Sequence, residues 1–188
     1  DSSVPMGWKL IDGQMIPTTI KLGANTPDTV VKVQHNHVSI SHDNSQTNGT
    51  DIPGGTAKFN DVADNDLNQT LTRTITINDP HEGAKAIIQT AKIYRDAVVD
   101  MVDGSVIYGK WSTAEWPEYT VPTVDGYMPS QATVAEKQVA NGDKDDAVTI
   151  DYAADQQTAK IVYVDENGQT VKTDTVNGKT DQDVKVDS

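Results

Sequence analysis

The sequence of 188 residues contains no cysteine, and only 5% of its residues are aromatic. Without cysteine the chain can form neither a disulfide framework nor a thiolate zinc site. Leucine and glutamate, which favour helices, are also scarce, with 4 and 5 copies. This scarcity excludes a helical bundle or a coiled coil. No apolar run approaches the roughly 18 residues that a membrane-spanning helix needs, so we expect no membrane insertion.

Basic residues are few as well. The chain has 15 Lys plus Arg against 28 Asp plus Glu, which gives a formal net charge of −13. Contacts to phosphate groups require patches of Lys and Arg. The charge balance therefore argues against binding to nucleic acid or to an anionic membrane.

Residues that favour strands and turns are abundant. Valine, isoleucine and threonine number 21, 13 and 22. Asn-Gly and Asp-Gly dipeptides, which adopt the positive φ angles of hairpin turns, occur seven times. The clearest predicted hairpin covers residues 160–175 and turns at Asn167-Gly168, and a further strand is expected over residues 70–77. The composition predicts a strand-dominated chain built from hairpins.

Two segments have ambiguous patterns. Over residues 30–41 the valines before and after position 35 fall on opposite faces, which indicates a bulge or, as we favour, a strand that passes from one module into the next. Residues 84–102 show both helical spacing and alternation. Their β-branched content and the Asp103-Gly104 turn favour strands over a helix.

Candidate catalytic and metal-binding residues are few. His35 and His37 would lie on one face of a strand near His42, but we favour polar residues on a solvated face over a metal site. The acidic clusters at 61–66 and 143–146 are interpreted as turn residues without a metal, since neither has the spacing of a calcium loop. No known catalytic motif is present. We therefore expect no enzyme activity, no bound metal and no cofactor.

Most of the aromatic residues fall between positions 94 and 127. Trp and Tyr offer rigid amphipathic surface to a carbohydrate or protein ligand, but a small β module also needs large residues in its core. We favour a structural role for Trp111 and Tyr127. Trp116 and Tyr119, which flank Pro117 and Glu118, are the candidate ligand-binding residues, with core packing as the alternative.

Three motifs within residues 66–152 resemble a known family. They are Thr-Arg-Thr-Ile at 72–75, Asp-x-x-x-Gly-x-x-x-Tyr-x-x-Trp at 100–111, and Pro-x-x-x-Gly-Tyr-x-Pro-Ser at 122–130. This stretch is similar to the Mub-type mucus-binding (MucBP-related) repeat of cell-surface adhesins of lactobacilli. Residues 7–38 resemble the end, and residues 159–180 the beginning, of the first half of such a repeat.

The resemblance implies an α+β fold, strongly strand-dominated with little helix, in an elongated tandem of small β-grasp (ubiquitin-like) modules. Residues 1–48 would be the C-terminal part of a first module with its linker strand, and residues 49–154 a complete second module. Residues 155–188 would be the opening hairpins of a next, or cut, first-type module. Adjacent repeats of the same protein are then expected partners.

The resemblance also implies a non-catalytic adhesin repeat that binds host mucus glycoproteins or mucin glycans. The protein would be extracellular and attached to the cell wall of a Gram-positive bacterium. Two alternatives remain: a structural spacer that projects an adhesive tip, and an immunoglobulin-binding module. Because the family offers no general ligand residues, none is transferred to this chain.

Overall fold

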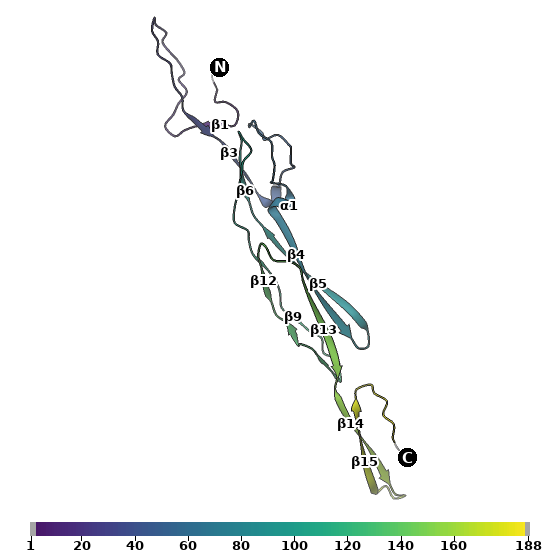
Figure 1. Ribbon diagram of the computed structural model, residues 1–188. Coiled ribbons are helices and arrows are strands. Elements are labelled where there is room, and N and C mark those ends of the chain that lie inside the picture. Colours follow the sequence, from purple (N-terminus) through teal and green to yellow (C-terminus); the bar gives the residue numbers. More distant parts are fainter. Residues whose placement is uncertain (1–2, 187–188) are drawn as a thin grey trace. The chain divides into compact units, whose positions relative to one another are not determined.

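The computed structural model describes residues 3–186 of the chain. Strands dominate it, and the described residues contain one α-helix of a single turn, α1 (Asp64–Leu67), and one 3-10 turn, η1 (His42–Asn44). The prediction of a strand-dominated chain with little helix is confirmed (Figure 1). Among the described residues no helix is long and apolar enough to cross a membrane.

The chain divides into two compact units. The first unit comprises Asp1–Thr70, Lys92–Ala114 and Val139–Asp143, and the second comprises Leu71–Ala91, Glu115–Gln138 and Lys144–Ser188. The boundaries fall within four strands, so that β4 (Asn68–Asp79), β5 (Gly83–Tyr94), β8 (Ala114–Trp116) and β12 (Lys137–Val139) each have residues in both units.

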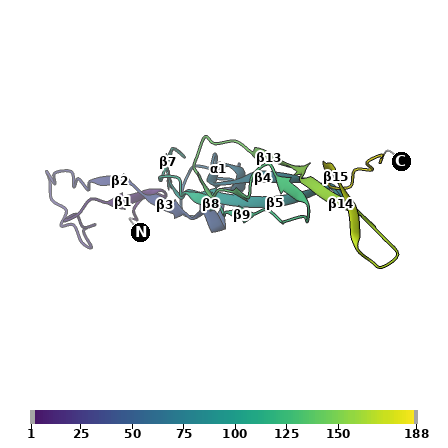
Figure 2. The same ribbon diagram turned by 90° about the horizontal axis from the view of Figure 1, so that it is seen from below.

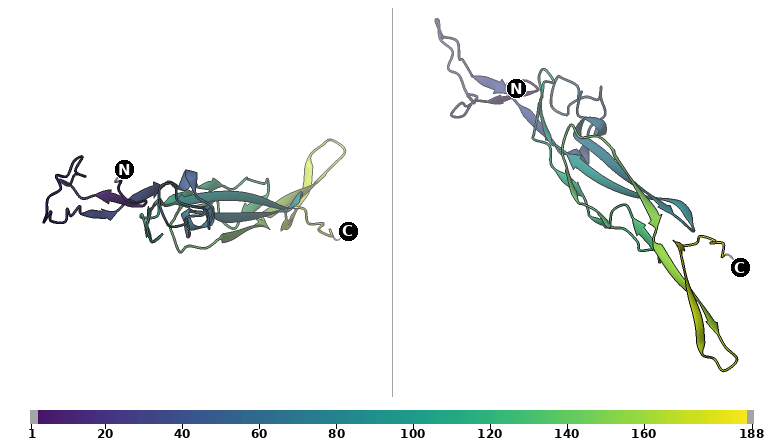
Figure 3. Two further views of the ribbon diagram at one scale, coloured as in Figure 1. Left: turned by 90° about the horizontal axis from the view of Figure 1, so that it is seen from above. Right: turned by 60° about the horizontal axis from the view of Figure 1, so that its bottom comes forward.

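The first unit contains two small sheets. One pairs β1 (Trp8–Leu10) with β2 (Val33–His35), and the other has the order β3 (His37–Ile40), β6 (Ala97–Asp100), β7 (Val106–Tyr108). The segment between β1 and β2 has no strand or helix (dark purple in Figure 3). The core of this unit consists of eight buried residues: Ile40, Ile52, Phe59, Val62, Leu67, Ala97, Val99 and Met101.

The change of face over residues 30–41 has a structural explanation. The strand is interrupted at Asn36, where β2 ends and β3 begins. β2 pairs with β1, whereas β3 pairs with β6 and contributes Ile40 to the core. The chain therefore passes from one sheet into another at this point. Both sheets belong to the first unit, so the passage from one module into the next stays a prediction.

The second unit is built on a mixed sheet with the order β10 (Tyr127–Pro129), β13 (Asp146–Ala154), β4, β5 (Figure 2). β13 runs parallel to β4, with Val148 opposite Ile75 and Ile150 opposite Ile77, and antiparallel to β10. Two further strand pairs are β9 (Tyr119–Thr120) with β11 (Thr133–Val134), and β8 with β12. The core contains Ile75, Ile77, Val121, Val134 and Ile150.

The expected strand over residues 70–77 corresponds to β4. Its core-facing positions Leu71, Ile75 and Ile77 are buried, as the alternation predicted, and Arg73 occupies the same face between them. Residues 84–102 form strands β5 and β6, so the preference for strands over a helix is also confirmed. Gly104 has a φ of 77°, which a side chain would disfavour, in the turn before β7.

The last two strands, β14 (Gln156–Val164) and β15 (Thr170–Lys179), form the predicted hairpin. Gly168 lies in its turn with a φ of 80°. Among the described residues, the hairpin is a two-stranded sheet that pairs with no other strand (Figure 1). Several of its apolar side chains are exposed, among them Val162, Tyr163, Val164 and Val171.

Candidate functional site

The two aromatic residues that the sequence singles out lie in different environments. Trp116, on β8, is fully buried with 0% of its surface exposed, and its indole Nε1 donates to the backbone oxygen of Leu71 at 3.3 Å. A buried ring offers no surface to a ligand. Its burial favours the core-packing alternative over the predicted ligand contact.

Arg73 lies beside Trp116 and is 2% exposed. Its guanidinium carbon is 5.7 Å from the centre of the Trp116 ring. Nε donates to Oε1 of Gln89 at 2.8 Å, Nη1 to the backbone oxygen of Ala135 at 2.8 Å, and Nη2 to the backbone oxygen of Pro117 at 2.7 Å. Arg73 thereby fixes the segment that leads into β9 and the segment that leaves β11.

Tyr119, at the start of β9, is half-buried and packs against the core of the second unit. Its strand is held in register by Val134 of β11. Tyr119 lines a pocket of about 540 Å³. The other lining residues are Ile77, Asp79, Glu82, Gly83, Ala84, Lys85, Ile87 and Pro122. The pocket combines apolar walls with three charged groups, a composition typical of small-ligand sites.

The charged groups of this pocket come from the end of β4, the turn between β4 and β5, and the beginning of β5. The backbone N–H groups of Glu82 and His81 donate to Oδ1 of Asp79 at 2.9 and 2.8 Å, and they lower the pKa of the Asp79 carboxyl. Nζ of Lys85 lies 3.4 Å from Oε2 of Glu82. The pocket therefore presents carboxylate acceptors and an ammonium donor close to an aromatic ring, a combination suited to hydroxyl-rich ligands.

Trp111 and Tyr127 have structural contacts, in agreement with the role that the sequence predicts. In the first unit, the guanidinium carbon of Arg95 lies 4.7 Å from the Trp111 ring centre and 3.4 Å from that of Tyr108. In the second unit, the Tyr127 hydroxyl donates to Oδ2 of Asp181 at 2.8 Å. This contact attaches the segment after β15 to β10.

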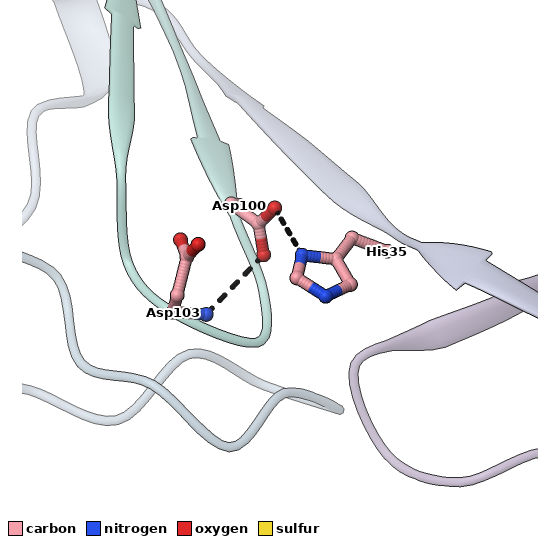
Figure 4. Close-up of side chains that lie close together, drawn as sticks. All are labelled: His35, Asp100 and Asp103. Carbon is pink, nitrogen blue, oxygen red and sulfur yellow. Dashed lines mark hydrogen bonds and ion pairs between the residues drawn. The ribbon is translucent and has the colours of Figure 1, made fainter.

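The histidines of the first unit separate into two groups. Nδ1 of His35 is 2.7 Å from Oδ2 of Asp100 (Figure 4). Nε2 of His37 is 3.7 Å from the same oxygen. His42 instead hydrogen-bonds Asp96 at 2.7 Å and stacks on Tyr94. Alternate spacing predicted that His35 and His37 share one face of a strand, but they lie on two strands, at the end of β2 and the start of β3, and both approach Asp100.

Asp100 is held by several hydrogen bonds. Burial acts to raise the pKa of its carboxyl, but donation from the Val102 N–H, from His35 and from the Asp103 N–H outweighs burial and leaves the pKa below its usual value. Its Oδ1 accepts from Val102 at 2.7 Å and from Asp103 at 3.3 Å. Oδ2 remains directed at the imidazole of His35 (Figure 4), and Nε2 of His37 lies 3.7 Å from it.

The acidic clusters were expected to be turn residues, but Asp64 and Asp66 lie in the single-turn helix α1, whereas Asp143 directly follows the turn at residues 141–142. Asp66 accepts from the backbone N–H of Ala63 at 2.9 Å, and Asp143 accepts from that of Ala140 at 2.8 Å. Within residues 3–186, the one set of three side chains placed to share a metal ion is His35, Asp100 and Asp103.

Sequence reasoning missed the residues around Tyr119 and the buried Arg73. Arg73 has a detectable signal, since it shares the parity of Leu71 and Ile75 on a strand whose other face carries threonines. No sequence signal identifies the pocket residues Asp79, Glu82 and Lys85, because only the folded sheet brings the β4–β5 turn beside β9.

Comparison with known proteins gives a family match over residues 62–156, to the model described as the Muc B2-like domain. The solved structure of Mub-RV is similar over 79% of this chain and 76% of its own, with 24% identity and a TM-score of 0.53. The type 2 repeat of the mucus binding protein MUB from Lactobacillus reuteri is similar over 79% of this chain and 76% of its own, with 26% identity and a TM-score of 0.44.

A shorter match is the mucin-binding domain of a Streptococcus pneumoniae protein. It has 27% identity and a TM-score of 0.42 over 46% of this chain and 91% of that domain. No curated protein sequence matches the chain.

Proposed function

The chain belongs to the Muc B2-like domain family, and on that basis we propose that it is a non-catalytic repeat of a cell-surface adhesin that binds host mucin glycoproteins. The observation that carries the proposal is the family match, which covers residues 62–156. The fold shared with Mub-RV supports the same assignment of architecture. The protein that contains the repeat would be exported and attached to the cell wall of a Gram-positive bacterium.

The proposed ligand-binding surface is the pocket beside Tyr119. Its ring can stack on the apolar face of a sugar, while Asp79, Glu82 and Lys85 are positioned to hydrogen-bond the hydroxyl groups around that sugar. Trp116, being buried, supports this surface from the core instead of contacting the ligand. Many weak contacts of this kind become strong when the repeat occurs many times.

Charge imposes a condition on this mechanism. Mucins carry acidic sugars, and a chain with a net charge of −13 repels them at long range. Binding must therefore come from short-range contacts such as those around Tyr119 and Lys85. Salt screens long-range repulsion, so we expect raised ionic strength to preserve or strengthen binding.

We expect Tyr119→Ala to weaken binding to immobilised mucin by about tenfold, because the variant loses the stacking surface of the pocket. Tyr163→Ala is the matched control, since it removes an exposed tyrosine from the hairpin, away from the pocket residues. Surface plasmon resonance on the same mucin surface measures both variants, and thermal unfolding confirms that each is folded.

Lys85→Ala provides a second test that leaves the core intact, because Lys85 is exposed. If both Tyr119→Ala and Lys85→Ala bind mucin with the affinity of the parent chain, this pocket is not the mucin-binding site. If the parent chain binds neither mucin nor immunoglobulin, the spacer alternative takes the place of adhesion. Saturable binding to immunoglobulin but not to mucin would favour the alternative of an immunoglobulin-binding module.

We further propose that the chain is a segment of a tandem of β-grasp-like modules, divided at residues 1–48, 49–154 and 155–188. The exposed apolar residues of β14 and β15 support this division, since a two-stranded hairpin gains stability by packing against further strands. In a protein that carries the adjacent repeat, amides of this hairpin should exchange about tenfold more slowly than in the chain alone. Equal exchange rates would contradict the division.

A further inference from the structure

One imidazole and two carboxylates converge where β2 and β6 meet in the first unit, and a second imidazole lies near them. His37 lies directly opposite Asp100 in the antiparallel pairing of β3 with β6. His35, at the end of β2, reaches the same carboxylate, with Nδ1 2.7 Å from Oδ2 of Asp100. The turn after β6 adds Asp103 (Figure 4).

We propose that His35, Asp100 and Asp103 bind a divalent transition-metal ion, for which Zn²⁺ is the representative. Imidazole nitrogen and carboxylate oxygen together suit zinc and its neighbours in the first transition series. The site is independent of the mucin-binding pocket, which lies in the second unit.

The distances are compatible with one shared ion. Donor atoms of His35, Asp100 and Asp103 lie within 4.8 Å of one another, and Nε2 of His37 is 3.7 Å from Oδ2 of Asp100. Metal–ligand bonds of about 2.0–2.2 Å place the donors of a tetrahedral ion roughly 3.4 Å apart. Binding of one ion would therefore require the donors of His35, Asp100 and Asp103 to adjust to this spacing.

The central ligand is preorganised. Asp100 is 6% exposed, and the backbone N–H groups of Val102 and Asp103 bind its Oδ1 and leave Oδ2 directed at the imidazoles. The ring of His35 packs edge-on against Trp8 at 4.4 Å between ring centres, which restricts its orientation. Oδ1 of Asp103 accepts from the backbone N–H of Ser105 at 2.8 Å, and the Ser105 side chain also hydrogen-bonds this carboxylate.

Two other histidine–aspartate pairs in the chain can be compared with the proposed metal site. His81 also contacts an aspartate, with Nε2 3.0 Å from Oδ2 of Asp181, and His42 contacts Asp96 at 2.7 Å. In the described part of the chain neither pair belongs to a cluster of three donors that could share an ion. A histidine–aspartate pair alone therefore does not define the proposed site, and His81 serves as the matched control.

Isothermal titration of the metal-free chain with Zn²⁺ tests the proposal. We expect saturable binding of one ion per chain, with affinity reduced at least about tenfold by His35→Gln and by Asp103→Asn. His81→Gln should remain within about twofold of the parent, since it removes an imidazole elsewhere. Titration with Co²⁺ should also give visible absorption bands in the parent that both site variants lose.

The variants separate a metal site from a structural hydrogen bond. Glutamine at position 35 retains a donor for Asp100, and Asp103 is exposed, so Asp103→Asn decides the question if His35→Gln does not fold. Absence of one-to-one binding by the parent would overturn the proposal. Equal affinity in the parent and Asp103→Asn would also overturn it, because the acidic surface would then be binding the ion non-specifically.

Discussion

Replacing Trp116 by alanine is expected to lower the free energy of unfolding by about 3–5 kcal/mol. The indole is fully buried, so its removal leaves a cavity that neighbouring side chains can fill only in part. It also leaves the backbone oxygen of Leu71 without its indole donor. This prediction follows from the packing role that the structure gives to a residue expected to contact ligand.

Urea denaturation followed by circular dichroism measures this effect, since the tryptophan fluorescence itself changes in the variant. Tyr163→Ala is the control, because it removes an aromatic ring that is 43% exposed on the hairpin. We expect the control to lose far less stability than Trp116→Ala. A loss below about 1 kcal/mol in Trp116→Ala would contradict the burial of this ring.

The second large effect is expected for Arg73→Met, at about 2–3 kcal/mol of unfolding free energy. Methionine fills much of the same space but donates no hydrogen bond. The backbone oxygens of Pro117 and Ala135 and the side chain of Gln89 then lose their charged donor. Because these oxygens flank β9 and β11, the pocket around Tyr119 should also loosen.

Lys172→Met is the matched control for the loss of a cation. Lys172 forms an exposed ion pair with Asp174 at 2.8 Å, and such pairs contribute little to stability. Denaturation of both variants under the same conditions should show a clear loss for Arg73→Met alone. If the two variants unfold at the same urea concentration, the buried hydrogen bonds of Arg73 do not stabilise the fold as we describe.

Much of the strand structure is predictable because it depends on local rules. Alternation over residues 70–77 and the Asn167-Gly168 turn identify β4 and the β14–β15 hairpin directly, since side-chain parity and positive φ angles are local properties. The change of parity between residues 31 and 40 coincides with a passage between two sheets of the first unit, and the passage between modules stays a prediction. Residues 84–102 needed composition and turn chemistry as well, because periodicity alone fits either structure.

The candidate sites depend on contacts that are distant in sequence, and these are harder to predict. Trp116 and Tyr119 flank the same proline, yet only Tyr119 reaches a pocket, because the pairing of β9 with β11 orients it beside the β4–β5 turn. His35 and His37 were predicted to share one face of a strand, but they lie on two strands separated at Asn36, and both approach Asp100. Their partner Asp100 lies 65 residues after His35, and its position depends on the register of β3 with β6.

The most direct test of the account is binding of the parent chain to purified mucin before and after removal of its glycans, measured by surface plasmon resonance at low and high salt. We predict saturable binding to intact mucin that falls at least about tenfold when the glycans are removed and that does not weaken as salt rises. Absence of saturable binding to intact mucin would contradict the proposal that this Muc B2-like repeat is adhesive. Binding abolished by salt would contradict the proposal that short-range contacts around Tyr119 provide its affinity.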